Sequence, residues 1–237
     1  SSARKLNGLD DAELDEPTLL PGWSRRHLVA HVGYNARGLC RLVTWAQTGE
    51  ETPMYASAEQ RDREIERGAT LLPHALRHLF DHAAVSLNVE WRDTDDAGWG
   101  AIVRTAQGRE VPLAETPWLR TRELWIHAVD LDNGARWSDI PDPVARRILA
   151  DIAGAWRKRG ERPGILLADA SGRGIARAGA EGAGEDPGED RIEVRGAVPA
   201  LLAWASGRAG ASQRARLAAV RLPWGDAVPV PDPPRWI

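Results

Sequence analysis

One segment constrains the fold more than any other: the run from Glu115 to Asp130, which reads as a helix beginning near Pro117. Most of this helix is apolar, and a helix that is apolar nearly all round is buried. Side chains three and four positions apart share a helical face, and one such stripe holds Arg120, Glu123, His127 and Asp130. Buried charges must be paired or must coordinate a metal. The stripe therefore predicts either an internal salt-bridge network or a functional site.

A second helix, from about Ser24 to Gln47, offers a partner for this stripe. Ser24 is a typical N-cap residue, and the apolar face that follows it has His31 at its centre, with Asn35 one turn further on. Two imidazoles and one carboxylate are a ligand set of catalytic zinc sites, which leave a fourth position open. Helical bundles build metal sites from side chains on facing helices. We therefore predict that His31, Glu123 and His127 bind a metal.

The residues leave alternatives to this metal site open. Glu-x-x-x-His is often a surface ion pair, and His31 could be a buried histidine whose hydrogen bonds are satisfied. His27 lies one turn before His31 and could compete with it as a ligand. A further helix carries His74, His78 and His82 at intervals of four residues, but its apolar residues fall on the opposite side. We expect these three histidines to face solvent.

Composition narrows the function classes. Of the 237 residues, 43% are hydrophobic and 27% are charged, as in an ordinary globular protein. The formal net charge of −3 does not indicate a nucleic-acid partner, and no apolar run is long enough for a membrane span. We expect a small-molecule substrate, no nucleic acid, no membrane and a cytoplasmic location. The single cysteine, Cys40, excludes an intramolecular disulfide and is expected to fill space within its helix.

The order of these patterns predicts two domains, a helical domain over residues 1–140 and a smaller α/β domain over residues 141–237. Helices of the first are expected near 24–47, 58–68, 73–92 and 116–131, with an irregular or extended stretch at 99–105. In the second we expect helices at 144–159 and 198–206 and strands at 164–169, 191–195 and 217–222. Residues 171–190, rich in Gly, Ala and Glu, are predicted to form a mobile loop. The proline-rich end cannot be helical, and Trp236 and Ile237 are expected to dock on the body.

Four segments resemble the mycothiol-dependent maleylpyruvate isomerases: Leu20–Ala36, Gly49–Tyr55, Glu115–Leu131 and Pro233–Ile237. The resemblance runs from about Leu9 to Ile237, and the family's bundle begins with a longer helix than Ser1 to Leu9 supplies. It implies a DinB-like four-helix bundle followed by a small, sterol-carrier-like α/β domain. It also implies a divalent metal, expected to be zinc, on His31, Glu123 and His127. The family has a functional arginine in a small-residue turn, which corresponds to Arg208.

The reaction that the resemblance implies is the cis–trans isomerisation of maleylpyruvate to fumarylpyruvate, with mycothiol as the thiol cofactor. The substrate carries two carboxylates, and arginine holds a carboxylate in a bidentate manner. Arg208 is the implied catalytic and substrate-binding residue, and Arg120 is a second substrate-binding candidate. Arg61 is a weaker one that we expect to be solvated. The alternative for Arg120 is a salt bridge to Glu123 or Asp130.

Two other functions fit the same residues. A mycothiol S-transferase would use the same metal ligands, and only its turnover would differ from that of an isomerase. A non-catalytic metal-binding regulatory domain would resemble the zinc anti-sigma proteins, but the His-x-x-x-Cys-x-x-Cys pattern of those proteins is absent from this sequence. The residue pattern therefore favours an enzyme.

Overall fold

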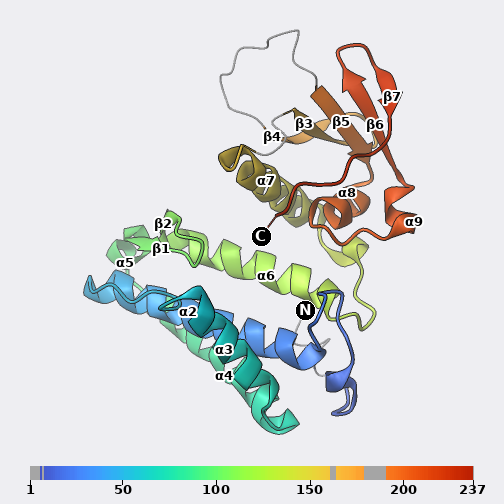
Figure 1. Ribbon diagram of the computed structural model, residues 1–237. Coiled ribbons are helices and arrows are strands. Elements are labelled where there is room, and N and C mark those ends of the chain that lie inside the picture. Colours follow the sequence, from blue (N-terminus) through green and yellow to red (C-terminus); the bar gives the residue numbers. More distant parts are fainter. Residues whose placement is uncertain (1–5, 7, 161–163, 179–190, 237) are drawn as a thin grey trace. The chain divides into compact units, whose positions relative to one another are not determined.

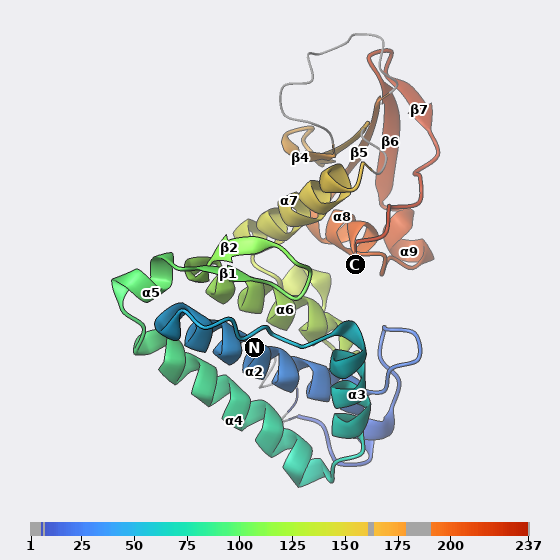
Figure 2. The same cartoon turned by 60° about the vertical axis from the view of Figure 1, so that its left-hand side comes forward.

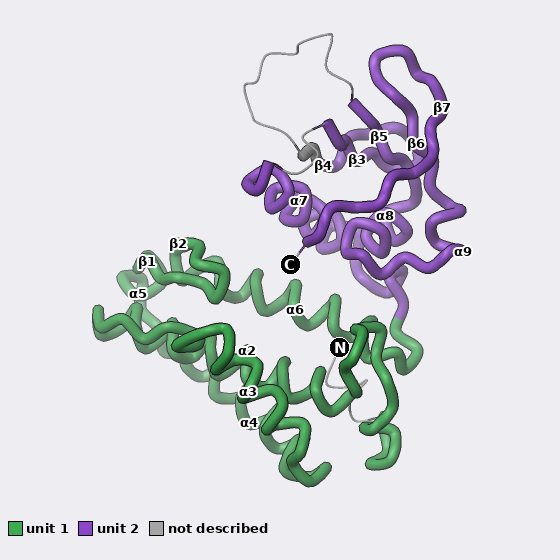
Figure 3. Tube along the Cα trace, in the orientation of Figure 1, with its two compact units in different colours: residues 1–135 green, residues 136–237 purple. Residues whose placement is uncertain are grey.

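The computed structural model describes residues 6, 8–160, 164–178 and 191–236. The chain divides into two compact units, residues 1–135 and residues 136–237 (Figure 3). The first is helical apart from one small hairpin, and the second combines helices with a mixed sheet. This arrangement confirms the predicted fold class, a mainly helical N-terminal part and an α/β C-terminal part. No helix within the described ranges has the length and apolar character that crossing a membrane requires.

Four helices form the framework of unit 1 (Figures 1 and 2): α2 (Arg25–Thr48), α3 (Ala58–Ala69), α4 (Pro73–Arg92) and α6 (Thr116–Asp130). Helix α2 is central, because it contacts each of the other three. The approach of α3 is close: a Cβ atom added at Gly68 would lie 2.7 Å from the Cβ of Ala30 on α2. All four helices lie where the periodicity of the sequence predicted them.

Local sequence explains where α2 and α6 begin and end. Ser24 precedes α2 in extended conformation, and its backbone N–H donates to Nδ1 of His27 at 3.2 Å. Gly49 ends α2 with a φ of 75°, a left-handed conformation that costs glycine little. Pro117 lies in the first turn of α6, where its missing N–H leaves no helical hydrogen bond unmade.

Short elements complete unit 1: η1 (Glu13–Asp15), α5 (Asp96–Gly100), β1 (Ile102–Arg104), β2 (Glu110–Pro112) and η2 (Leu113–Glu115). Strands β1 and β2 pair in an antiparallel hairpin, in which Val103 lies opposite Val111. Both valines are buried and join a core cluster that includes Leu39 and Leu42 of α2. The stretch predicted as irregular or extended at 99–105 therefore contains one strand of a hairpin that is anchored in the core.

Unit 2 is built on a five-stranded sheet with the strand order β4-β3-β5-β6-β7. Its strands are β3 (Ile165–Asp169), β4 (Gly174–Ala178), β5 (Arg191–Gly196), β6 (Leu217–Leu222) and β7 (Asp226–Val228). Strands β3 and β5 run parallel, and the other neighbouring pairs are antiparallel. Leu167 of β3 lies opposite Val194 of β5, and both side chains are buried.

The helices of unit 2 are η3 (Trp137–Asp139), α7 (Asp142–Lys158), α8 (Val198–Ala205) and α9 (Ala211–Arg214). Helices α7 and α8 pack on each other along one face of the sheet (Figures 1 and 2). Trp156 of α7 and Trp204 of α8 are both 0% exposed, and their rings meet edge to face with centroids 5.9 Å apart. Aromatic pairs favour this geometry, so the two tryptophans fix the contact between the helices.

The prediction of a mobile loop over residues 171–190 is wrong for part of this segment. Residues Gly174–Ala178 form β4, an edge strand whose partner β3 supplies backbone hydrogen bonds that the residue composition does not reveal. Residues 179–190 lie outside the described ranges. The docking of the C-terminal segment is confirmed for Trp236, which is 8% exposed and accepts at its carbonyl from Nη1 of Arg159 at 3.0 Å. Ile237 is not described.

Candidate metal centre

The structure brings His31, Glu123 and His127 together. Nε2 of His31 lies 2.6 Å from Oε1 of Glu123, and Nε2 of His127 lies 3.2 Å from the same oxygen. The two imidazole rings are perpendicular, with centroids 5.0 Å apart. One candidate ligand atom from each residue lies within 4.8 Å of the other two. The side chains are 7%, 20% and 10% exposed respectively, so water has limited access to this cluster.

Two helices position the cluster. His31 lies in the second turn of α2, on the buried face predicted from the sequence. Glu123 and His127 lie one turn apart on α6, and an i,i+4 spacing places both on one face. The rings of Trp23 and His31 meet edge to face, with centroids 5.4 Å apart.

Asp130 holds His127 in position. Its Oδ2 lies 2.9 Å from Nδ1 of His127, and the carboxylate is 0% exposed. Histidine ligands of metals usually donate the N–H of their other nitrogen to a carboxylate or carbonyl, which fixes the tautomer and the ring orientation. Asp130 therefore leaves Nε2 of His127 as the nitrogen that faces the cluster. The sequence placed Asp130 on the polar stripe but assigned it no role.

The two histidines differ in pKa and therefore in protonation state. Burial lowers the pKa of His31, so its imidazole is neutral near pH 7. Burial also opposes protonation of His127, but the charge of Glu123 and the hydrogen bonds from Asp130 and Glu123 together raise its pKa to about 9. Burial alone would raise the pKa of Glu123, yet the two histidines hold it well below its usual value. Without a metal, the cluster is a carboxylate between one imidazolium and one imidazole.

The donor set fits a divalent metal. Two imidazole nitrogens converge on one carboxylate oxygen from two helices, and two imidazoles with one carboxylate match the protein ligands of catalytic zinc sites. Three protein ligands leave a fourth position for water or a substrate atom. The same three residues also satisfy one another by hydrogen bonding, so the site can be preformed before a metal enters.

The arginine candidates lie in different places. Arg120 is 4% exposed, and its Nη1 donates to the carbonyl oxygen of Val32 at 2.7 Å and to Oδ1 of Asn35 at 2.9 Å. Its hydrogen bonds therefore join α6 to α2, and the alternative of a salt bridge to Glu123 or Asp130 is not formed.

Arg61 was expected to be solvated, but only 33% of its side chain is exposed. It is half-buried on α3, and its Nη2 lies 3.4 Å from Nδ1 of His31. The helix looks solvated in sequence because it is mostly polar, and only the packing of α3 against α2 places this residue beside the cluster.

Arg208 belongs to unit 2 and follows α8. Its backbone N–H donates to the carbonyl of Ala203 at 2.8 Å, and its Nη1 donates to the carbonyl of Ser206 at 2.6 Å. Gly207 has a φ of 77°, which gives the turn the left-handed residue that glycine favours.

The other histidines and Cys40 lie outside the cluster. His74, His78 and His82 are exposed on α4, as predicted. His27 caps α2 through Nδ1, and its Nε2 lies 3.4 Å from Glu66. Cys40 is half-buried, and burial is the main cause that raises the pKa of its thiol to about 11, so little thiolate exists near pH 7.

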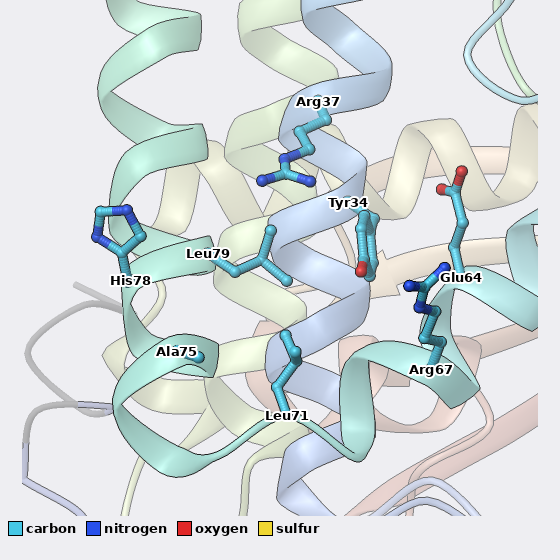
Figure 4. A pocket seen from close by; sticks show the side chains of 8 residues that line it. All are labelled: Tyr34, Arg37, Glu64, Arg67, Leu71, Ala75, His78 and Leu79. Atoms are coloured by element: carbon cyan, nitrogen blue, oxygen red, sulfur yellow. The ribbon is translucent and has the colours of Figure 1, made fainter.

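A hollow of about 480 Å³ lies between α2, α3 and α4, apart from the cluster (Figure 4). Tyr34 and Arg37 of α2, Arg67 of α3 and His78 of α4 extend toward it. The guanidinium of Arg37 lies over the Tyr34 ring at 5.6 Å. Arg37, Arg67 and His78 are all exposed, so the hollow is a surface depression. None of the three candidate metal ligands lines it.

Fold and cluster together define a class: a helical bundle that carries two histidines and a glutamate at its centre, followed by a small α/β unit. The family model described as mycothiol maleylpyruvate isomerase N-terminal domain matches residues 1–132. The chain belongs to the mycothiol maleylpyruvate isomerase family.

Solved structures extend this likeness over nearly the whole chain. A crystal structure of the mycothiol-dependent maleylpyruvate isomerase is 43% identical to this chain and covers 99% of it and 91% of its own length, with a TM-score of 0.85. A crystal structure of a variant of that isomerase, in which one histidine is replaced by alanine, gives the same values. A comparison with curated proteins found no match.

Proposed function

We propose that this protein is a metal- and mycothiol-dependent isomerase that converts maleylpyruvate to fumarylpyruvate. The observation that carries the proposal is the cluster of His31, Glu123 and His127 within a chain that is 43% identical, over 99% of its residues, to an isomerase of that name. Zinc is the metal that the two-histidine, one-glutamate donor set favours.

The chemistry explains why an external thiol is needed. The C=C bond of maleylpyruvate does not rotate while it remains double. Bound mycothiol would supply a nucleophile whose addition leaves a single bond free to turn and whose elimination restores the alkene and the thiol. The chain offers no substitute, because Cys40 is its single cysteine and burial keeps that thiol protonated near pH 7.

The residues of the cluster have distinct roles in this proposal. His31, Glu123 and His127 hold the metal, and Asp130 orients His127. A divalent cation at this position would supply a Lewis acid that lowers the pKa of a thiol in its open position. Arg120 and Arg208 are the proposed partners of the substrate carboxylates, because a guanidinium fork matches carboxylate geometry.

Substoichiometric mycothiol tests the reaction. Metal-loaded protein is mixed with maleylpyruvate and with mycothiol at a tenth of the substrate concentration, and substrate loss is followed. An isomerase regenerates the thiol, so we expect conversion of all the substrate and no loss of free thiol. A reaction that stops after one thiol equivalent, with a stable thioether, would show an S-transferase. If no reaction occurs with any thiol, both enzyme functions are refuted and the non-catalytic regulatory domain is the alternative that remains.

A further inference from the structure

Several buried polar atoms in unit 1 lack a hydrogen-bond partner within the described part of the chain. Among them are the hydroxyl of Tyr55, Nη2 of Arg120 and Oε2 of Glu64. Buried polar groups are nearly always hydrogen-bonded, so each exception requires an explanation. Tyr55 and Arg120 offer donors, whereas Glu64 offers an acceptor. The two donors lie close enough to interact electrostatically.

Arg120 is a buried cation whose printed hydrogen bonds all go to neutral groups. Both acceptors of its Nη1, the Val32 carbonyl and the Asn35 amide, are neutral. No carboxylate among the described residues forms an ion pair with it. Burial lowers its pKa to about 10, so the guanidinium still carries its charge near pH 7. A buried charge without a directly bonded counter-charge is costly, and an anionic ligand would reduce this cost.

The position of Arg120 on α6 places it near the cluster of candidate metal ligands. It lies three residues before Glu123 on α6, and its partner Asn35 lies four residues after His31 on α2. One helical turn is about 5.4 Å long, so the guanidinium lies roughly one turn from the cluster along both helices. It interacts electrostatically with both Glu123 and Tyr55.

Tyr55 is held in place by contacts to α2. Nε of Arg41 donates to the carbonyl of Met54 at 2.9 Å, and the Arg41 guanidinium lies 5.6 Å from the centre of the Tyr55 ring. Met54 packs so close to Gly38 that a Cβ atom there would lie 3.2 Å from the Met54 Cε. Burial is the main cause that raises the pKa of Tyr55 to about 12, so its hydroxyl remains a donor.

We propose that Arg120 and Tyr55 form a carboxylate-binding subsite beside the candidate metal ligands. In this subsite, Nη2 of Arg120 and the hydroxyl of Tyr55 donate to the same carboxylate group. The identity of its ligand as one end of a small dicarboxylate rests on the proposed function. Tyr55 would thereby determine which substrates bind, and the sequence alone gives it no such role. Glu64 is an acceptor and takes no part in holding an anion.

Binding of maleate, a simple cis dicarboxylate, tests this subsite without turnover. Isothermal titration calorimetry gives the dissociation constant for the metal-loaded wild type and for Tyr55→Phe. Loss of a hydrogen bond to a charged group should weaken binding about tenfold or more. The melting temperature should be unchanged or higher, because the lost hydroxyl has no partner in the free protein. Tyr34→Phe, the other tyrosine of the chain, is the matched control and should bind maleate like the wild type.

Asn35→Asp tests the charge of Arg120 without removing it. The change places a carboxylate where Oδ1 of Asn35 accepts from Arg120, 2.9 Å away, and so gives the guanidinium an internal counter-ion. Maleate binding should weaken at least as much as in Tyr55→Phe, while metal content is retained.

Three results would overturn the subsite: no maleate binding to the wild type, unchanged binding in Tyr55→Phe, or an equal loss in Tyr34→Phe. Normal maleate binding and the expected losses in a protein that does not turn over maleylpyruvate would instead refute the proposed function alone.

Discussion

Metal binding to the cluster should release a proton from His127. The pKa of this histidine is raised to about 9 in the metal-free protein, so at pH 7 its imidazole carries a proton that a metal ligand must lose. A raised pKa means that the proton is bound below about pH 9 and competes with the metal there. Apparent metal affinity should therefore fall as the pH is lowered.

The size of the effect follows from the pKa. Two pH units separate neutral pH from the pKa of about 9, so the apparent affinity at pH 7 should be about 100-fold below its high-pH limit, or roughly 3 kcal/mol. Calorimetric titration of the metal-free protein with zinc, in buffers of different ionisation enthalpy, counts the protons released. About one proton from His127 is expected near pH 7. An affinity that does not change between pH 6.5 and 8, with no proton release, would refute the reasoning.

The variant Asp130→Asn tests whether the released proton comes from His127 or from another source, such as a metal-bound water. The asparagine removes the charge that helps to raise the His127 pKa, so fewer protons should be released near pH 7. It also weakens the support of a metal ligand, which typically costs 10- to 100-fold in affinity. Equal proton counts in Asp130→Asn and the wild type would show that the released proton does not come from His127.

The remaining predictions concern both units. His31→Ala should lose bound metal and isomerase activity together, whereas the exposed His78→Ala should change neither, as metal analysis and an activity assay would show. Arg208→Lys should lower kcat/KM for maleylpyruvate by roughly tenfold or more with metal content unchanged, because a point charge replaces a bidentate fork; full activity would exclude the proposed role. Hydrogen bonds from Ser171 and Arg146 hold the pKa of Asp169 below its usual range, so its contribution to stability is present above about pH 4 and is lost as the pH falls. Asp169→Asn should be less stable in urea at pH 7 and should lose less stability than the wild type between pH 5 and 3.

Helical periodicity predicted much of the bundle and its cluster. Glu123 and His127 share a face by their spacing alone, and His31 stood out as the polar residue at the centre of an apolar face. These are properties of single helices, which a sequence displays directly. Pairing of the two faces is a tertiary contact, and it was inferred because buried polar groups require partners.

The features that the sequence did not predict depend on contacts between elements. Arg61 lies on a polar helix and reaches His31 only because α3 packs on α2. Tyr55 lies in a segment without periodicity, and its place is fixed by Met54 against Gly38. The sequence of strand β4 contains glycine and lacks a clear alternation of apolar and polar residues. Its pairing with β3 is what defines it as a strand. Such residues acquire their environment from chain segments distant in sequence.

The two helices that supply the cluster have a consequence for folding. His31 and Glu123 are 92 residues apart in the chain, so a cation bound by both would act as a cross-link that closes a long loop. In the chain-entropy treatment of cross-links, a loop of this length removes about 4–5 kcal/mol of entropy from the unfolded chain, as an upper limit. Helices α3 and α4 and the small hairpin all lie within that loop. Chelation would therefore lower the free energy of unfolding of the N-terminal unit, and the same ion that serves the chemistry would also stabilise the fold.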